Sequence, residues 1–292
     1  MKARHDPAWL DAQYNNRARV PDHAAVLQRW ADASALARRE SRPLLDVAYG
    51  EGAGETLDIF PPPLPAAGGS PVLVFIHGGY WRALDKADHS FVAPAFNAQG
   101  ALVVVPNYAL CPAVTVEHIA LQMAQMLAWV WRNIARHGGD PARIALTGHS
   151  AGGHLATMLL SCRWKDVAPD LPPQPVTGAL SISGLYDLEP LRHTPFVQID
   201  LKLTPSSVAR LSPAFFTRPK GVNGGPKLYT TVGLDESDEF LRQNRLIRDV
   251  WGPTAVPVCE TIPGTNHFTV LNGLADPAGR LHELALRLLG LR

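Results

Sequence analysis

The chain has 292 residues, of which 46% are hydrophobic, and a formal net charge of +1. The hydrophobic fraction is ordinary for a chain that buries a full core, and we expect a single domain over residues 1–292. A nearly neutral chain without a basic stripe or an acidic tail argues against nucleic acid or an anionic membrane as its main partner.

The N-terminus and the cysteines favour a cytoplasmic location. The first six residues lack the apolar run of a secretory signal, and the apolar stretches elsewhere are far shorter than a bilayer span. Cys111, Cys162 and Cys259 are odd in number, widely spaced and outside any C-x-x-C pattern. We expect them to be free thiols in a reducing compartment, because neither a disulfide framework nor a zinc site has this spacing.

The first 45 residues are expected to form a helical segment, which contains Trp9, Tyr14 and Trp30 among many arginines. Two roles stay open for it: a helix packed on a sheet, or a flap over the mouth of an active site. A hairpin should follow. The proline- and glycine-rich stretch 61–69 is then expected to be a loop, since these residues exclude both helix and strand.

From residue 71 onward, short apolar strands alternate with longer segments of helical spacing. Such alternation predicts a mostly parallel sheet with helices on both faces. The segment 185–226 lies outside this pattern and is expected to be a cap or a substrate loop. The predicted strands are 71–76, 101–105, 143–147, 176–183, 227–232 and 256–262, and the predicted helices are 116–136, 151–161, 240–250 and 278–291.

A serine lies between the predicted strand 143–147 and the predicted helix 151–161, in the pentapeptide GHSAG. The pentapeptide alone would also fit a tight turn with an incidental serine. Its position between strand and helix favours a nucleophile, Ser150, on a strained turn that leaves no room for side chains two residues before and after it. The N–H of Ala151 would then point toward an oxyanion.

A second glycine-containing motif, HGGYW, directly follows the predicted strand 71–76. Acyl transfer needs at least two donors where the carbonyl oxygen becomes negative, and consecutive glycines allow backbone N–H groups to turn inward. We therefore predict an oxyanion hole made by the N–H groups of Gly78, Gly79 and Ala151. The aromatic Tyr80 and Trp81 are candidates for binding the substrate.

The general base is expected to be His267, because it lies in a loop between the last strand and the last helix. His149 and His154 flank the serine too closely in sequence for this role and are expected to support the turn. The acid is left open between Asp235 and Glu236, which are adjacent after the strand 227–232. Asp187 is a more distant third candidate.

These motifs resemble the kynurenine formamidase (arylformamidase) branch of the α/β-hydrolases. The likeness runs from an N-terminal Tyr-Asn-Asn-Arg, which begins at Tyr14, to the last helix. Besides HGGYW and GHSAGG, the stretches that carry it are NYALCP at 107–112, GLYDLEP at 184–190, LKLTP at 201–205, EFLRQ at 239–243 and NHF at 266–268.

The resemblance implies an α/β-hydrolase fold and a serine hydrolase that cleaves N-formyl arylamines such as N-formylkynurenine, without a metal or an organic cofactor. It also favours Glu236 over Asp235 as the acid, counting back from EFLRQ. Tyr80, Trp81 and the segment 185–216 would surround an aromatic leaving group. The alternatives are a short-chain carboxylesterase and, from another class, a non-catalytic protein of this fold that binds a small ligand. The sequence does not decide whether the chain forms a homodimer.

Overall fold

The computed structural model describes residues 6–52, 54–219 and 225–291. Within them, eight strands form one sheet in the order β1-β2-β4-β3-β5-β6-β7-β8. Only β2 runs antiparallel to its neighbours, and β3 to β8 pair in parallel. The strands are β1 (Leu44–Ala48), β2 (Thr56–Phe60), β3 (Ser70–Ile76), β4 (Leu102–Pro106), β5 (Gly139–His149), β6 (Gly178–Ile182), β7 (Lys227–Gly233) and β8 (Val258–Ile262).

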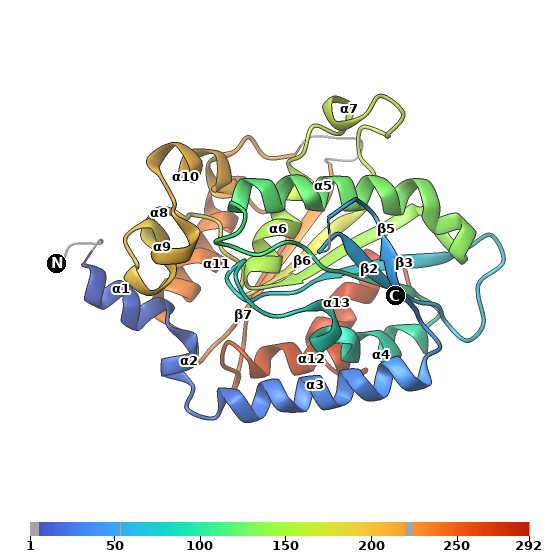
Figure 1. The fold of residues 1–292 in the computed structure, drawn as a ribbon, viewed down its shortest axis with the longest axis horizontal. Coiled ribbons are helices and arrows are strands. Elements are labelled where there is room, and N and C mark those ends of the chain that lie inside the picture. The colour runs from blue at the N-terminus through green and yellow to red at the C-terminus, as the bar shows by residue number, and fades with distance from the viewer. Residues whose placement is uncertain (1–5, 53, 220–224, 292) are drawn as a thin grey trace.

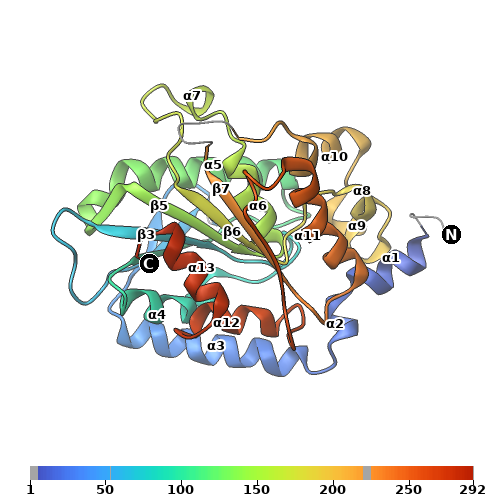
Figure 2. The same ribbon diagram turned by 180° about the vertical axis from the view of Figure 1, so that it is seen from behind.

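Helices cover both faces of this sheet (Figures 1 and 2). The longer ones are α1 (Pro7–Tyr14), α3 (His23–Glu40), α5 (Val116–Asn133), α6 (Ala151–Leu160), α11 (Asp238–Trp251) and α13 (Arg280–Leu288). The shorter ones are α2 (Asn16–Arg19), α4 (Ala93–Asn97), α7 (Trp164–Val167), α8 (Glu189–Arg192), α9 (Pro195–Leu201), α10 (Pro205–Leu211) and α12 (Asn272–Ala275). Single 3₁₀ turns are η1 (Lys86–Val92), η2 (Ile134–His137), η3 (Pro213–Phe215) and η5 (Thr269–Leu271).

The central strand β3 shows why the sheet is buried on both sides. Its side chains point alternately to the two faces. Val72, Val74 and Ile76 join the apolar core beneath α5, α6 and α11, whereas Leu73 and Phe75 join the core beneath α3, α4 and α13. An uninterrupted run of apolar residues is what a parallel strand covered by helices on both faces requires.

The predicted strands and long helices are present, with ends that shift by a few residues. The largest shift is in β5, which begins at Gly139. The hairpin β1–β2 precedes the loop 61–69 as expected, and the three cysteines form no disulfide. In the described part of the chain, no helix is both long enough and apolar enough to cross a membrane.

Two parts of the chain contribute residues to the cavity at the carboxyl ends of the parallel strands. The segment 7–40 forms α1, α2 and α3, and α3 runs along one face of the molecule beside α4 and α12 (Figure 1). The segment 189–215 folds into α8, α9, α10 and η3, and α1 packs against α8 and α9. The predicted segments 1–45 and 185–226 therefore meet at one end of the sheet. Residues 1–5 and 220–224 lie outside the described residues.

Candidate active site

Ser150 occupies a sharp turn between β5 and α6. Its backbone has φ 55° and ψ −118°, a conformation that L-residues rarely adopt. The turn is so tight that a Cβ atom on Gly148 would lie 2.2 Å from the carbonyl oxygen of Gly152, and one on Gly152 would lie 2.0 Å from that of Ile76. The two glycines of the motif are therefore required by close backbone contact, and they place the serine side chain above the end of the sheet.

A chain of hydrogen bonds leads away from Ser150. The Nε2 atom of His267 lies 3.1 Å from Ser150 Oγ, and its Nδ1 atom lies 2.6 Å from Glu236 Oε2. The side chains of His267 and Glu236 are almost fully buried. The other carboxylate oxygen, Glu236 Oε1, accepts from the Gly233 N–H at 2.8 Å and from Ser183 Oγ at 2.5 Å. These contacts fix the carboxylate toward the histidine.

The structure separates the three candidate acids. Asp235 is exposed, and no hydrogen bond joins its side chain to His267 in the described part of the chain. Asp187 forms an ion pair with Arg242 at 3.3 Å instead. Among the three, only Glu236 contacts His267.

The HGGYW loop lies against the nucleophile turn. A Cβ atom on Gly78 would lie 3.1 Å from Ser150 Cβ, and Gly79 has φ +106°, which favours glycine. In the described part of the chain, the N–H groups of Gly78, Gly79 and Ala151 donate to no other residue. Three unpaired donors beside a serine hydroxyl can stabilise a developing oxyanion.

A tyrosine and a histidine hold the carbonyl groups of this loop. The Tyr108 hydroxyl donates to His77 O at 2.9 Å and lies 3.3 Å from Gly78 O. The ring of Tyr108 stacks on the ring of His77, with 4.3 Å between centroids. His77 Nδ1 lies 2.8 Å from Gly78 O, and burial lowers the pKa of this histidine below its ordinary value. Because Tyr108 and His77 hold the carbonyl groups on one side of the loop, its N–H groups face the other side.

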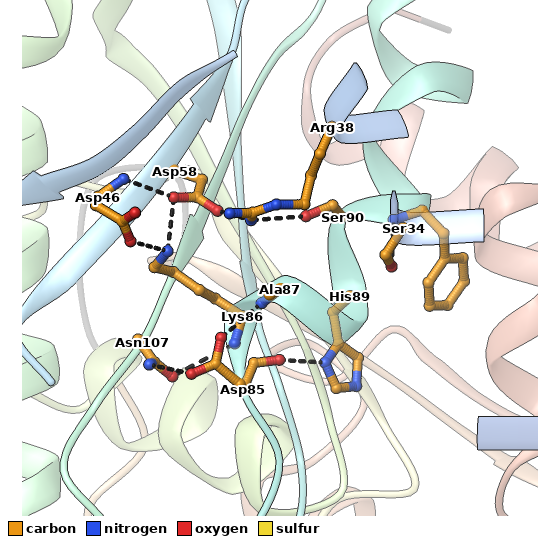
Figure 3. Close-up of polar contacts among 11 residues, drawn as sticks. Ser34, Arg38, Asp46, Asp58, Asp85, Lys86, Ala87, His89, Ser90 and Asn107 are labelled. Atoms are coloured by element: carbon orange, nitrogen blue, oxygen red, sulfur yellow. Dashed lines mark hydrogen bonds and ion pairs between the residues drawn. The ribbon is translucent and has the colours of Figure 1, made fainter. Parts of the chain in front are cut away.

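The loop is tied, through Asn107, to an ion cluster around the buried Lys86 and Asp58; Figure 3 shows Asn107 and this cluster. Asn107, just after β4, donates to Asp85 Oδ2 at 2.7 Å, and its Oδ1 lies 3.1 Å from His77 Nε2. The next residue after Asp85 is Lys86, whose Nζ donates to Asp58 Oδ1 at 2.7 Å and to Asp46 Oδ1 at 2.6 Å. The far side of the oxyanion loop is therefore supported by charged groups from β1 and β2.

A cavity of about 280 Å³ opens above Ser150. Its walls come from the oxyanion loop, the nucleophile turn, the His267 loop, α9 and the N-terminal segment. Its apolar wall is formed by Leu27, Trp30, Tyr80, Leu84, Phe196 and Phe268. Its polar side chains include Asn15, Asn16, Arg17, Arg82, Ser150 and His267. The N-terminal segment thus both packs on the sheet and forms one wall of the cavity.

The two aromatic residues of the HGGYW loop have different positions. Tyr80 lines the cavity, and its hydroxyl donates to Tyr14 O at 2.7 Å. Trp81 is fully buried and packs edge-on against His154, with 5.0 Å between ring centroids. In this structure Trp81 does not line the cavity, although its backbone has almost the same positive φ as that of Tyr80, 55° against 51°; its role in binding substrate stays a prediction.

Sequence reasoning assigned His149 only a supporting role, and the structure shows what it contacts. Its Nε2 atom lies 2.8 Å from the backbone oxygen of His267, and the two rings are 4.8 Å apart. Burial and the neighbouring His267 lower the pKa of His149 well below its ordinary value. A neutral ring with Nε2 protonated donates to the loop that carries the base.

Four residues that the sequence did not assign to the site contribute to it: Ser183 behind Glu236, Tyr108 behind the oxyanion loop, and Asn16 and Arg17 in the cavity wall. Tyr108 belongs to the stretch NYALCP, which carried no assigned role. Asn16 and Arg17 belong to the Tyr-Asn-Asn-Arg stretch, so the resemblance marked their position but not their place at the cavity. Among the described residues, no group of three or more His, Cys, Asp or Glu side chains is arranged to hold a metal ion.

The comparisons with known proteins agree with this architecture. A family described as alpha/beta hydrolase fold matches residues 73–220. The kynurenine formamidase of Danio rerio is 32% identical over 293 residues, which cover 96% of each chain. The kynurenine formamidase of Salmo salar is 30% identical over 96% of this chain and 93% of its own.

A solved structure is similar over almost the same length. It is a crystal structure from Silicibacter sp. TM1040, described as a candidate thioesterase, with 31% sequence identity and a TM-score of 0.80. The match covers 94% of this chain and 98% of that one. From the family match and the full-length relatives, the chain belongs to the alpha/beta hydrolase family and, within it, to the group of hydrolases that contains the kynurenine formamidases.

Proposed function

We propose that this hydrolase is an arylformamidase, which removes the formyl group from N-formylkynurenine or a closely related N-formyl arylamine. The observation that carries the proposal is the full-length similarity to two kynurenine formamidases. The hydrogen-bonded chain of Ser150, His267 and Glu236 supports it, because hydrolysis of an amide needs an activated nucleophile.

In the first half of the proposed reaction, His267 takes the proton of Ser150 Oγ while this oxygen attacks the formyl carbon. Glu236 accepts the Nδ1–H of His267, which holds the ring in the tautomer that leaves Nε2 free to act as a base. The N–H groups of Gly78, Gly79 and Ala151 stabilise the oxyanion. His267 then gives its proton to the departing arylamine nitrogen, and a formyl ester remains on Ser150.

In the second half, a water molecule attacks the formyl ester. His267 takes a proton from this water and returns it to Ser150 Oγ as the new tetrahedral intermediate collapses, which releases formic acid, ionised to formate in solution, and the free serine hydroxyl. Aromatic side chains form most of the apolar wall of the cavity, which suits an aromatic leaving group better than a long acyl chain.

The alternative is a short-chain esterase or thioesterase that uses the same residues. It is favoured by one observation, namely the similarity to the structure described as a candidate thioesterase. The test compares kcat/KM for N-formylkynurenine with kcat/KM for a short-chain nitrophenyl ester. We expect the formamide to be the better substrate. Turnover of the ester with negligible turnover of the formamide would favour the alternative.

A non-catalytic protein of the same fold is distinguished by a covalent probe. We expect a fluorophosphonate to label the folded protein at Ser150, since an activated serine reacts with such probes. The Ser150→Ala variant is the control for labelling elsewhere. If the wild-type protein stays unlabelled, it is not a serine hydrolase.

A further inference from the structure

The junction of α1 and α2 is held firmly at the mouth of the cavity. The Tyr14 hydroxyl donates to Glu239 Oε2 at 2.7 Å, and Gln243 Nε2 donates to this hydroxyl at 3.2 Å. Glu239 and Gln243 belong to α11, which is distant in sequence. On the other side, the hydroxyl of Tyr80 binds the Tyr14 carbonyl. Asn15 caps α2 by accepting from the Ala18 N–H. The next two residues, Asn16 and Arg17, are therefore fixed relative to the oxyanion loop.

The first of these two residues, Asn16, is a buried amide without a partner. It is only 5% exposed, and its Nδ2 atom is buried and has no hydrogen bond to any described residue. It also lines the cavity above Ser150. An unsatisfied buried donor costs about 1–3 kcal/mol. A bound molecule with an acceptor oxygen can occupy the part of the cavity that Asn16 lines. After a small rotation of the amide, a hydrogen bond to this oxygen would remove the cost of the unsatisfied donor.

The second residue, Arg17, supplies a charge to the same wall. It is exposed, lines the cavity, and forms no ion pair or hydrogen bond within the described residues. The other arginine of the cavity, Arg82, is already bound to Asp200 at 2.5 Å and to Phe196 O at 2.7 Å. No aspartate or glutamate is among the described residues that line the cavity. Arg17 therefore carries an unpaired positive charge at the wall of this cavity, which attracts an anion.

We propose that Asn16 and Arg17 form a subsite for a carboxylate on the leaving group of the substrate. This inference rests on the proposed function, because it requires that Ser150 attacks a carbonyl group in the same cavity. A carboxylate accepts hydrogen bonds both from an amide and from a guanidinium, so one group would satisfy both residues. A single guanidinium also matches a single negative charge, and a cationic group at this place would be repelled.

The test uses two acetyl esters that differ only at the far end of the leaving group. One is 3-(4-acetoxyphenyl)propanoate, which carries a carboxylate, and the other is the corresponding neutral primary amide. For the wild type we expect kcat/KM to be about tenfold higher for the carboxylate, as one charge-assisted hydrogen bond would give. The preference should appear in KM and should weaken at high salt.

Four variants examine the assignment through the ratio of the two kcat/KM values. Arg17→Gln should bring the ratio close to one, and Arg17→Lys should keep part of the preference. Asn16→Asp should reverse the ratio, because a second carboxylate repels the first. The matched control is Arg19→Gln, which removes the same charge from the same helix at a residue that does not line the cavity; it should leave the wild-type ratio intact.

Failure of this inference and failure of the proposed function give different results. A wild type that hydrolyses both esters equally well, or an Arg17→Gln variant that keeps the full preference, overturns the carboxylate subsite and leaves the hydrolase assignment untouched. A wild type that hydrolyses the carboxylate ester preferentially but not N-formylkynurenine overturns the formamidase proposal and supports the subsite. Hydrolysis of neither ester and of no formamide contradicts both.

Discussion

Glu236 and Asp235 are neighbours in the chain, but their side chains have opposite surroundings. The Gly233 N–H and Ser183 hydroxyl bind one oxygen of Glu236, and His267 lies against the other. Asp235 faces solvent. Adjacent side chains on a turn point in different directions. The sequence therefore indicates that only one of the two can face His267. Which of the two points inward depends on the partners on β6 and β7, and those become visible only in the folded chain.

The first prediction concerns these two residues. Glu236→Gln should lower kcat by about 10³–10⁴-fold, because an amide no longer selects the tautomer of His267 that serves as base. KM should change little, since Glu236 lies behind the histidine and away from the substrate. Steady-state kinetics on the best available ester or formamide measures both constants. Asp235→Asn is the matched control, and a loss of kcat in this variant comparable with that of Glu236→Gln would contradict the assignment.

At the scale of elements, the oxyanion loop depends on the chain that follows β4. We predict that Tyr108→Phe lowers kcat by about tenfold with a smaller effect on KM, because the carbonyls of His77 and Gly78 lose their donor and the opposing N–H groups lose their fixed direction. Tyr49→Phe is the matched control, as its hydroxyl donates to Asn107 O at 2.8 Å and does not touch the loop. Equal effects of the two variants on kcat would show that Tyr108 acts only through stability.

The ion cluster around Lys86 and Asp58 joins four elements. The fully buried Asp58 of β2 accepts from Lys86 of η1, from Arg38 of α3, and from the N–H of Asp46 in β1 at 2.9 Å (Figure 3). The Lys86 ammonium also keeps the pKa of the Asp46 carboxyl below its ordinary value. A buried carboxylate that loses one of its cationic partners is left partly uncompensated.

We therefore predict that Lys86→Met lowers the free energy of unfolding by about 3 kcal/mol. Urea unfolding monitored by tryptophan fluorescence measures the change. The control is Lys165→Met, since Lys165 is exposed and donates to the Pro169 carbonyl. The cluster would have to be regarded as a minor contributor if the two variants were equally stable.

For the whole molecule, the sequence predicted those features that arise from repeated local patterns. Every residue of the run 71–76 is apolar, which predicts a strand covered by helices on both faces. In the structure, all residues of β3 are buried. The short helices between 189 and 211 were not predicted, because helices of four to seven residues are too short to display a periodicity. The burial of Trp81 beside His154 was also not predicted, since this contact joins residues that are far apart in the sequence.

The final prediction concerns the stability of the whole molecule at mildly acidic pH. Several histidines are buried, and the prediction concerns His89, His149 and His154 among them. Burial lowers the pKa of His89 to about 3 and that of His154 to about 4, and it lowers the pKa of His149 well below 6.5. In the unfolded chain these groups titrate near pH 6.5. Below this pH the unfolded state binds more protons than the folded state, so the free energy of unfolding must fall as the pH falls.

The decrease in the free energy of unfolding should begin near pH 6.5. By pH 5 it should amount to roughly 2 kcal/mol for each of His89 and His154, whose pKa values lie below this window. This window lies above the ordinary pKa of carboxyl groups, so ion pairs such as that of Glu189, whose pKa Arg192 lowers to about 2, contribute mainly at lower pH. Urea unfolding at half-unit steps of pH measures the slope. His154→Gln should reduce the dependence of the free energy of unfolding on pH by the contribution of one histidine. The same substitution at the exposed His118 is the control and should leave this dependence unchanged. A stability that stays constant from pH 6.5 to 5 would mean that the buried histidines accept protons without leaving their sites.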